Sequence, residues 1–351
     1  MHVLLGQVDR EAWNGFLRQQ SYSHFWHSWE WGEFLASFKQ REILRFSVHD
    51  KGGDVLGLST VCIEPLPHFG KRGDSIPVWH LGGPVLQDSL DHEARKAVCQ
   101  QLINVVDREL RERRALDMTF RVWDPFSDHT CFEPWLKAGY RMRERCTWMC
   151  TIPEDESQLM KTFAGNFRSR VKQGYRRGGV VEINITADIR ELYELHKMSM
   201  VHGGTDPRYS LDEVSYALNW NNDLRDIYLC RHEGRLIGFL LSLKFNRVTL
   251  AWLSGMNRSH SEIRPMNLMF HELIRNSARQ KMRTVDLGGG VTKGATHFKE
   301  GAGAKPTSTF NLSKVYCSRP YLMLARGCAA GPEKLVRKAV FALLEGRFGH
   351  G

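Results

Sequence analysis

The sequence contains no apolar run long enough to cross a membrane, and its N-terminus lacks the features of a secretory signal. A membrane helix needs about 18 or more mostly apolar residues in succession. A signal peptide starts with a basic stretch followed by an apolar one, and the first seven residues, MHVLLGQ, contain neither. We therefore expect a cytoplasmic protein with no membrane span.

Paired cysteines and clustered metal ligands are also missing. None of the eight cysteines forms a CxxC pair, and no group of Cys and His residues has the spacing of a zinc site. The fifteen histidines are scattered, and none belongs to a Ser/His/Asp arrangement with useful spacing. Free thiols are the ordinary state of cysteine in the cytoplasm. We expect no disulfide framework, no metal and no bound cofactor.

The length and composition indicate two globular domains. The chain has 351 residues, of which 42% are hydrophobic and 11% aromatic, so each half can bury a core of its own. Lys and Arg number 49 against 39 Asp and Glu, a formal net charge of +10. Such an excess attracts polyanions: tRNA, nucleotide-linked substrates or an anionic membrane surface. Because many basic proteins bind no nucleic acid, charge alone leaves this open.

A weak internal repeat predicts the fold. Gly53–Gly57 (GDVLG) and Gly234–Gly238 (GRLIG) share the pattern Gly-polar-apolar-apolar-Gly, and apolar stretches flank each one. Both are typical of a β-hairpin with glycine in its turn. Each hairpin is followed by a predicted strand, helix and strand. The expected elements are 78–81, a helix through 90–110 and 118–123 in the first copy, and 248–253, 265–279 and 285–287 in the second.

This repeat predicts an α/β (α+β) protein made of two tandem domains, each with a mixed, mostly antiparallel sheet flanked by helices. The apolar pattern breaks at 153–157, PEDES, which places a boundary there. We expect one domain over residues 1–152, a second over 153–318 and a helical tail over 319–351. The tail is amphipathic, and it either packs on the second domain or docks on a membrane surface or partner.

A basic segment, 163–179, opens the second domain, and two glycines end it as expected of a helix stop. Its cationic side chains are either a solvated helix face or a surface that contacts phosphates and displaces counterions. The candidate tRNA-binding residues are Arg168, Arg170, Lys172, Arg176 and Arg177, together with Lys293 further along the chain.

The second domain contains a more specific pattern. Arg264-Pro265-Met266-Asn267-Leu268 begins a predicted helix, Val285-Asp286-Leu287-Gly288-Gly289 ends a strand, and His297-Phe298-Lys299-Glu300-Gly301 follows. This pattern resembles the FemABX family of non-ribosomal peptidyl transferases, which add amino acids from aminoacyl-tRNA to peptidoglycan precursors. Relatives with the same double acetyltransferase-like (GNAT-like) fold aminoacylate small molecules or peptides. His27-Ser28-Trp29-Glu30-Trp31 is similar to the family's N-terminal Trp signature.

The resemblance implies an acyltransferase that forms an amide bond. The donor is aminoacyl-tRNA, and the acceptor is an amine on a peptidoglycan precursor or on a natural-product intermediate. Because the ester is already activated, the enzyme has to align the reactants and stabilise a developing negative charge. Lys299 is the implied catalytic residue and Phe298 shapes the acceptor channel. The alternative is that Lys299 is a solvated surface lysine.

The implied acceptor-binding residues lie in both halves of the chain. Glycines after a strand let a ligand approach the backbone closely. Arg208 and Tyr209 correspond to an Arg–Tyr pair that contacts the acceptor's phosphates in the family, and a guanidinium matches phosphate geometry. The alternative is that they form the turn before a helix capped by Ser210. The family's phosphate-gripping lysine after the Trp-Gly step is absent, and Lys39 is the first basic residue, so a different amine is an open alternative. The set is Trp31, Lys39, Arg208, Tyr209, Gly288 and Gly289.

The expected donor follows from a loop that lacks glycine. Acetyltransferase folds that use acyl-CoA hold its pyrophosphate on backbone N–H groups of a glycine-rich loop at a helix start. The corresponding residues, 257–265, contain no glycine. This favours aminoacyl-tRNA as donor. Two alternatives stay open: an acyl-CoA-dependent N-acyltransferase, and a non-catalytic relative that binds tRNA or a membrane surface.

Overall fold

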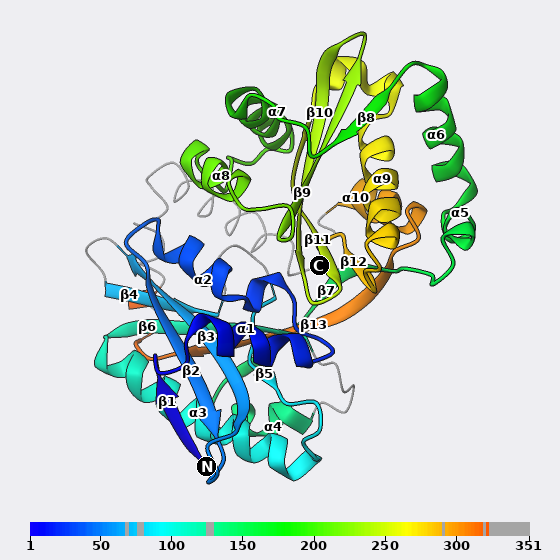
Figure 1. Cartoon of the computed structure of the whole chain (residues 1–351). Helices are drawn as coiled ribbons and strands as arrows, with labels where there is room; N and C mark the ends of the chain where they lie inside the picture. The colour runs from blue at the N-terminus through cyan, green and yellow to red at the C-terminus, as the bar shows by residue number, and fades with distance from the viewer. Residues whose placement is uncertain (67–69, 76–80, 124–129, 290–291, 319–320, 323–351) are drawn as a thin grey trace, which may run out of the picture. The chain divides into compact units, whose positions relative to one another are not determined.

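The computed structural model describes residues 1–66, 70–75, 81–123, 130–289, 292–318 and 321–322, which belong to two compact units (Figure 1). Unit 1 contains Met1–Asp9, Leu35–Arg143 and the chain from Phe310 onward. Unit 2 contains Arg10–Phe34 and Glu144–Thr309. Each unit has its own hydrophobic core.

The units differ from the contiguous domains 1–152 and 153–318. The segment Arg10–Phe34 belongs to unit 2, because aromatic side chains such as Trp26 and Trp31 pack against Trp252 there. The last described strand returns the chain to unit 1 from Phe310 onward. Apart from 321–322, the expected tail 319–351 lies outside the described residues.

Unit 1 is a mixed sheet with a long helix on it. Its strand order is β1-β2-β3-β4-β6-β13, with β5 paired to β3. The expected first hairpin is confirmed as the antiparallel pair β2–β3, and β4 lies parallel to β6. Residues 78–80 of the expected strand 78–81 lie outside the described residues. The strands are β1 (His2–Leu5), β2 (Glu42–His49), β3 (Val55–Leu66), β4 (Gly70–Asp74), β5 (Val85–Leu86), β6 (Ala115–Trp123) and β13 (Lys305–Val315).

Helix α3 (His92–Glu112) follows the predicted helical pattern. Asp91 caps its start by accepting a hydrogen bond from Ala94 N. One face buries Val98, Leu102 and Val106 in the core shared with the sheet. The short helix α4 (Glu133–Lys137) packs beside α3.

Unit 2 repeats this arrangement with the strand order β7-β12-β11-β10-β9-β8. The second hairpin is confirmed as β9–β10, with Glu233 and Gly234 in the turn at φ values of 50° and 75°. Parallel pairing of β11 with β12 covers Val248–Leu250 opposite Thr284–Asp286. The strands are β7 (Arg141–Thr151), β8 (Val180–Ile183), β9 (Arg225–His232), β10 (Arg235–Phe245), β11 (Val248–Met256) and β12 (Thr284–Asp286).

Helices α7 and α9 pack on this sheet, and α9 has the bounds that the sequence predicts (Figure 1). Pro265 occupies its first turn, where a missing N–H costs no hydrogen bond. In the part of the chain that the structure describes, no helix is both long and apolar enough to cross a membrane. The helices are α1 (Arg10–Gln19), α2 (Trp29–Ala36), α5 (Leu159–Thr162), α6 (Gly165–Arg176), α7 (Ile189–His202), α8 (Leu211–Leu218), α9 (Pro265–Arg279) and α10 (Lys293–Gly301).

Glycine lets α6 lie close to the start of α9. A Cβ atom on Gly174 would lie 2.6 Å from the carbonyl oxygen of Ile263 and 2.9 Å from the side chain of Leu268. The helix ends at Arg176, and Gly178 just after it has a φ of +79° and donates its N–H to Tyr175 O. The predicted basic helix with a glycine stop is therefore confirmed.

Candidate functional site

The end of β12 forms a hydrogen-bonded turn. Oδ1 of Asp286 accepts the Gly288 N–H at 2.7 Å and the Thr147 hydroxyl at 2.5 Å. Gly288 has a φ of +75°, a conformation that glycine adopts without steric cost. Asp286 and Thr147 are both buried, so their hydrogen bonds hold the turn from the protein interior.

Lys299 joins this turn to helix α10. Thr292 caps the start of the helix, its hydroxyl accepting the Ala295 N–H, and Lys299 lies in the last turn. Nζ of Lys299 donates to the carbonyl oxygens of Gly288 and Gly289, both at 2.7 Å. The lysine is 9% exposed. An ammonium has three N–H donors, and these two carbonyls use two of them.

The surroundings lower the proton affinity of this lysine without removing its charge at neutral pH. Burial lowers the pKa of Lys299 to about 8, and the nearby Asp286 and Cys146 oppose that shift. Burial also raises the pKa of Asp286, against the hydrogen bonds from Thr147 and Gly288 and the charge of Lys299. A buried ammonium with one N–H not used by these carbonyls is suited to donate a hydrogen bond to an oxygen that becomes negative.

Phe298 lies between helices. Its ring centroid is 5.6 Å from that of Phe167 on α6 and 5.1 Å from that of Phe270 on α9, with edge-to-face geometry in both pairs. The side chain is half-buried against the core of unit 2. These contacts hold α10 against α6 and α9. The predicted role in an acceptor channel stays a prediction.

The structure divides the basic residues of α6 into two groups. Arg168 donates to the carbonyl oxygens of Met160 and Phe163, and Arg177 donates to that of Glu262, so both hold neighbouring backbone. The exposed side chains without a hydrogen bond or ion pair to any other described residue are Arg170, Lys172 and Arg176. Lys293, at the first position of α10, is exposed as well.

Two of the predicted acceptor-binding residues are core residues of unit 2. Trp31 is 1% exposed and Tyr209 is 3% exposed. Each packs on Trp252, with ring centroids 5.8 and 5.0 Å away. Phe34 stacks on Trp31 at 4.7 Å. In this arrangement neither predicted residue presents a surface for direct contact with an acceptor, because aromatic neighbours cover it.

The other two acceptor candidates outside the glycine turn are exposed. Arg208 precedes α8, where Ser210 and Glu213 form a reciprocal capping box, so the helix-start interpretation is confirmed. Its guanidinium is exposed beside this start. Lys39 lies in unit 1, in the turn before β2, with a φ of 59°.

Sequence reasoning gave no role to Asp286 and Thr147. Asp286 ends the strand two residues before Gly288, a position from which a carboxylate caps the following turn. Thr147 lies 139 residues earlier in the chain, and no local pattern connects it with this turn. Among the described residues, no group of three or more His, Cys, Asp or Glu side chains is arranged to hold a metal ion.

Comparisons with known proteins agree with this fold. Residues 161–300, which include α6 and Lys299, match the family described as acetyltransferase (GNAT) domain. The structure of FemX superposes with a TM-score of 0.73 at 13% identity and covers 89% of this chain and 97% of FemX. A comparison with curated proteins by sequence gave no match.

Two further structures have related folds. One is the C-terminal domain of a putative lysylphosphatidylglycerol synthetase from Agrobacterium fabrum, with a TM-score of 0.52, 14% identity and coverage of 83% of this chain and 88% of that one. The other is a tandem GNAT protein from the clavulanic acid biosynthesis pathway, with a TM-score of 0.51, 14% identity and coverage of 79% and 84%. The chain thus has the FemX-type tandem GNAT fold, as its sequence predicts, and its residues 161–300 match a GNAT domain.

Proposed function

We propose that this protein is an aminoacyltransferase that moves an amino acid from aminoacyl-tRNA to an amine acceptor and forms an amide bond. The observation that carries the proposal is the buried Lys299 ammonium, held on the Gly288 and Gly289 carbonyls at 2.7 Å each. This group lies within the segment that matches a GNAT domain.

The reaction requires little covalent assistance. The acceptor nitrogen attacks the ester carbonyl carbon, the carbon–oxygen bond to the tRNA ribose breaks, and an amide forms. The proton lost by the amine is taken up by the leaving ribose oxygen. The third N–H of Lys299 donates to the oxygen on which negative charge develops. Removing one such donor typically slows an enzyme by about 100- to 1,000-fold.

Three features support tRNA as the donor carrier. Arg170, Lys172 and Arg176 form an exposed basic surface on α6, and the whole chain carries a net charge of +10. The residues before α9 form a 3₁₀ helix, Arg258–Ile263, without glycine, which disfavours close approach of a CoA pyrophosphate. The FemX-type fold and the lysylphosphatidylglycerol synthetase likeness favour an aminoacyl group over an acetyl group.

The acceptor is an amine on a peptidoglycan precursor or on a small-molecule or peptide intermediate of natural-product synthesis. Exposed cations such as Arg208 and Lys39 suit an acceptor that carries phosphate. Trp31 and Tyr209 are buried, so in this proposal they support acceptor binding through packing and not by direct contact. Peripheral contact of the amphipathic tail, residues 319–351, with a membrane is part of the same proposal; apart from 321–322 this tail lies outside the described residues.

A transfer assay tests the donor. The protein is incubated with a pool of tRNA charged with radiolabelled amino acids and with an extract of amine-bearing precursors, and a parallel reaction contains labelled acetyl-CoA. We expect label to pass from tRNA into an amide product, and pretreatment with ribonuclease to abolish this transfer. Transfer from acetyl-CoA with none from tRNA would show an acyl-CoA enzyme instead. Binding of tRNA without any transfer would show a non-catalytic relative.

A further inference from the structure

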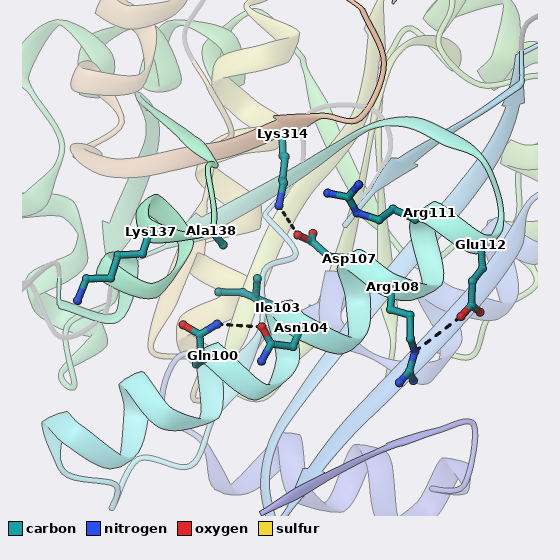
Figure 2. Close-up of a pocket in the computed structure, with 10 residues that line it drawn as sticks. All are labelled: Gln100, Ile103, Asn104, Asp107, Arg108, Arg111, Glu112, Lys137, Ala138 and Lys314. Atoms are coloured by element: carbon teal, nitrogen blue, oxygen red, sulfur yellow. Dashed lines mark hydrogen bonds and ion pairs between the residues drawn. The ribbon is translucent and has the colours of Figure 1, made fainter.

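Unit 1 contains a hollow that the proposed reaction does not use. It has a volume of about 570 Å³ and lies between α3, the end of α4 and β13 (Figure 2). Small-molecule sites commonly measure about 300–1,000 Å³. The hollow belongs entirely to unit 1, so it is independent of the Lys299 site in unit 2.

One face of α3 forms the floor. Gln100, Ile103, Asp107 and Arg111 recur at intervals of three or four residues and therefore lie on the same side of the helix. Ile103 is 1% exposed and belongs to the core, as does the opposite side of α3, so the polar residues of this face line the open part of the hollow. The two ends of this face differ in polarity. At one end the Gln100 amide donates to the Asn104 Oδ1 at 2.9 Å, and at the other end the side chains are charged.

The charged end is organised around Asp107. Its Oδ1 accepts the hydroxyls of Tyr140 at 2.8 Å and Tyr316 at 2.7 Å, and its Oδ2 is paired with Nζ of Lys314. Lys314 and Asp107 point toward each other in Figure 2. Three donors thus engage this one carboxylate, which has little capacity left to neutralise a second cation.

A second cation is present. The guanidinium of Arg111 lies 5.3 Å from the ring centroid of Tyr316, and Nζ of Lys314 lies 5.7 Å from the same ring. Figure 2 shows the Arg111 side chain extending toward Lys314 and Asp107. Among the described residues, Arg111 has no carboxylate partner. Asp107 is paired with Lys314 and not with Arg111, so these three side chains together carry a net positive charge at this end of the hollow.

We propose that this hollow binds a small organic phosphate, with its phosphate group on Arg111 and Lys314. A guanidinium fork matches phosphate oxygens in two-point contact, and lysine adds a point charge. A phosphate monoester carries about −1.5 to −2 charge at pH 7, which the local cation excess favours. The polar body of the ligand hydrogen-bonds the Gln100–Asn104 pair and rests on Ala138.

Isothermal titration of the full-length protein tests this proposal, with adenosine 5′-monophosphate, adenosine and acetate as probes. We expect saturable binding of the monophosphate with a dissociation constant below about 1 mM, a range typical of weak specific sites, and no binding of adenosine or acetate. Equal binding of adenosine or acetate, or no binding of the monophosphate at about 10-fold higher concentration, would overturn the phosphate assignment.

Variants locate the binding. Arg111→Ala should weaken it about tenfold or more, since charge-assisted contacts are the strong ones. Arg111→Lys should recover part of the loss, which guards against a simple folding defect. Arg143→Ala removes the same charge from an exposed position of unit 1 outside the hollow and should bind normally. If Arg143→Ala weakens binding as much as Arg111→Ala, or if reversing charges on α6 abolishes it, the ligand binds elsewhere and the proposal fails.

Discussion

Nζ of Lys299 lies 2.7 Å from the carbonyl oxygen of Gly288, so the lysine in the last turn of α10 is fixed to the turn that ends β12. The same turn is held from below by Asp286 through the Gly288 N–H. The ammonium is therefore pre-positioned before any substrate arrives. Groups that need no reorganisation during the reaction stabilise developing charge most effectively.

The pH dependence of transfer tests the charge state of Lys299. Its pKa is lowered to about 8 by burial, so the ammonium is present below that pH and is lost as the pH rises through it. We expect kcat/KM to fall on the alkaline side with a midpoint near pH 8, after subtraction of spontaneous ester hydrolysis. The acidic side reports protonation of the acceptor amine, whose nitrogen must be neutral to attack.

Replacing Asp286 should move that alkaline midpoint. The Asp286 carboxylate raises the pKa of Lys299 against the effect of burial. Asp286→Asn keeps an oxygen that can accept the Gly288 N–H but removes the charge, so the midpoint should shift below that of the wild type. Thr147→Val, which removes a hydrogen bond to Asp286 but no charge, is the matched control and should shift it less. An unchanged midpoint in Asp286→Asn would mean that the alkaline fall of kcat/KM does not follow the deprotonation of Lys299.

Reversing charge on α6 should weaken tRNA binding. The triple variant Arg170→Glu, Lys172→Glu and Arg176→Glu leaves the backbone hydrogen bonds of Arg168 and Arg177 intact. Each phosphate group that the protein no longer neutralises reduces the slope of log affinity against log salt by about 0.7–0.9. We expect lower affinity and a flatter slope in filter-binding titrations at several salt concentrations.

A control triple reverses the same number of charges elsewhere on unit 2. Arg190→Glu, Arg247→Glu and Lys281→Glu are exposed and lie outside α6. This control should keep most of the affinity. Equal reductions in affinity in the two triple variants would show that tRNA binding depends on the net charge of the protein and not on the α6 surface.

Gly174→Ala should destabilise unit 2. The added Cβ would lie 2.6 Å from the Ile263 carbonyl oxygen, and overpacking of this kind costs about 1–3 kcal/mol. Gly294→Ala is the control, since no atom beyond its chain neighbours and its own helix backbone lies within 4 Å of its Cβ, and alanine favours a helix by about 0.5–1 kcal/mol. Urea denaturation measures both. A Gly174→Ala protein as stable as the wild type would contradict the close packing of α6 on α9.

Substitutions of Phe298 distinguish a role in packing between helices from direct contact with the acceptor. Phe298→Leu keeps much of the apolar volume between Phe167 and Phe270, so we expect near-normal stability and transfer within about threefold of the wild type. Phe298→Ala should lower the free energy of unfolding by about 2 kcal/mol and reduce transfer with it. A Phe298→Leu protein that folds normally but no longer catalyses transfer would show that the aromatic ring contacts the acceptor.

Local pattern predicted the elements of the fold well. Glycine-centred hairpins and apolar spacing placed β2–β3, β9–β10, α3 and α9, because these signals depend on neighbouring residues. Membership of Arg10–Phe34 in unit 2 was not predictable in this way. It depends on contacts such as Trp31 with Trp252, which lie more than two hundred residues apart.

The candidate site shows the same limit. The glycine turn and Lys299 could be found from the motif, but the motif does not say that the glycines act as hydrogen-bond acceptors for the lysine. Residue type alone also could not separate Arg168, which holds the end of α5, from Arg170, which is exposed. Residue type likewise could not show that Tyr209 is buried in the core of unit 2.

The central claim is that the Lys299 ammonium stabilises charge during aminoacyl transfer, and single-turnover transfer by Lys299→Met measures it most directly. The account predicts a rate about 100- to 1,000-fold below that of the wild type, with tRNA affinity unchanged. Lys293→Met, an exposed lysine on the same helix, should keep its transfer rate once tRNA is saturating. A Lys299→Met protein that transfers at the wild-type rate would contradict the account.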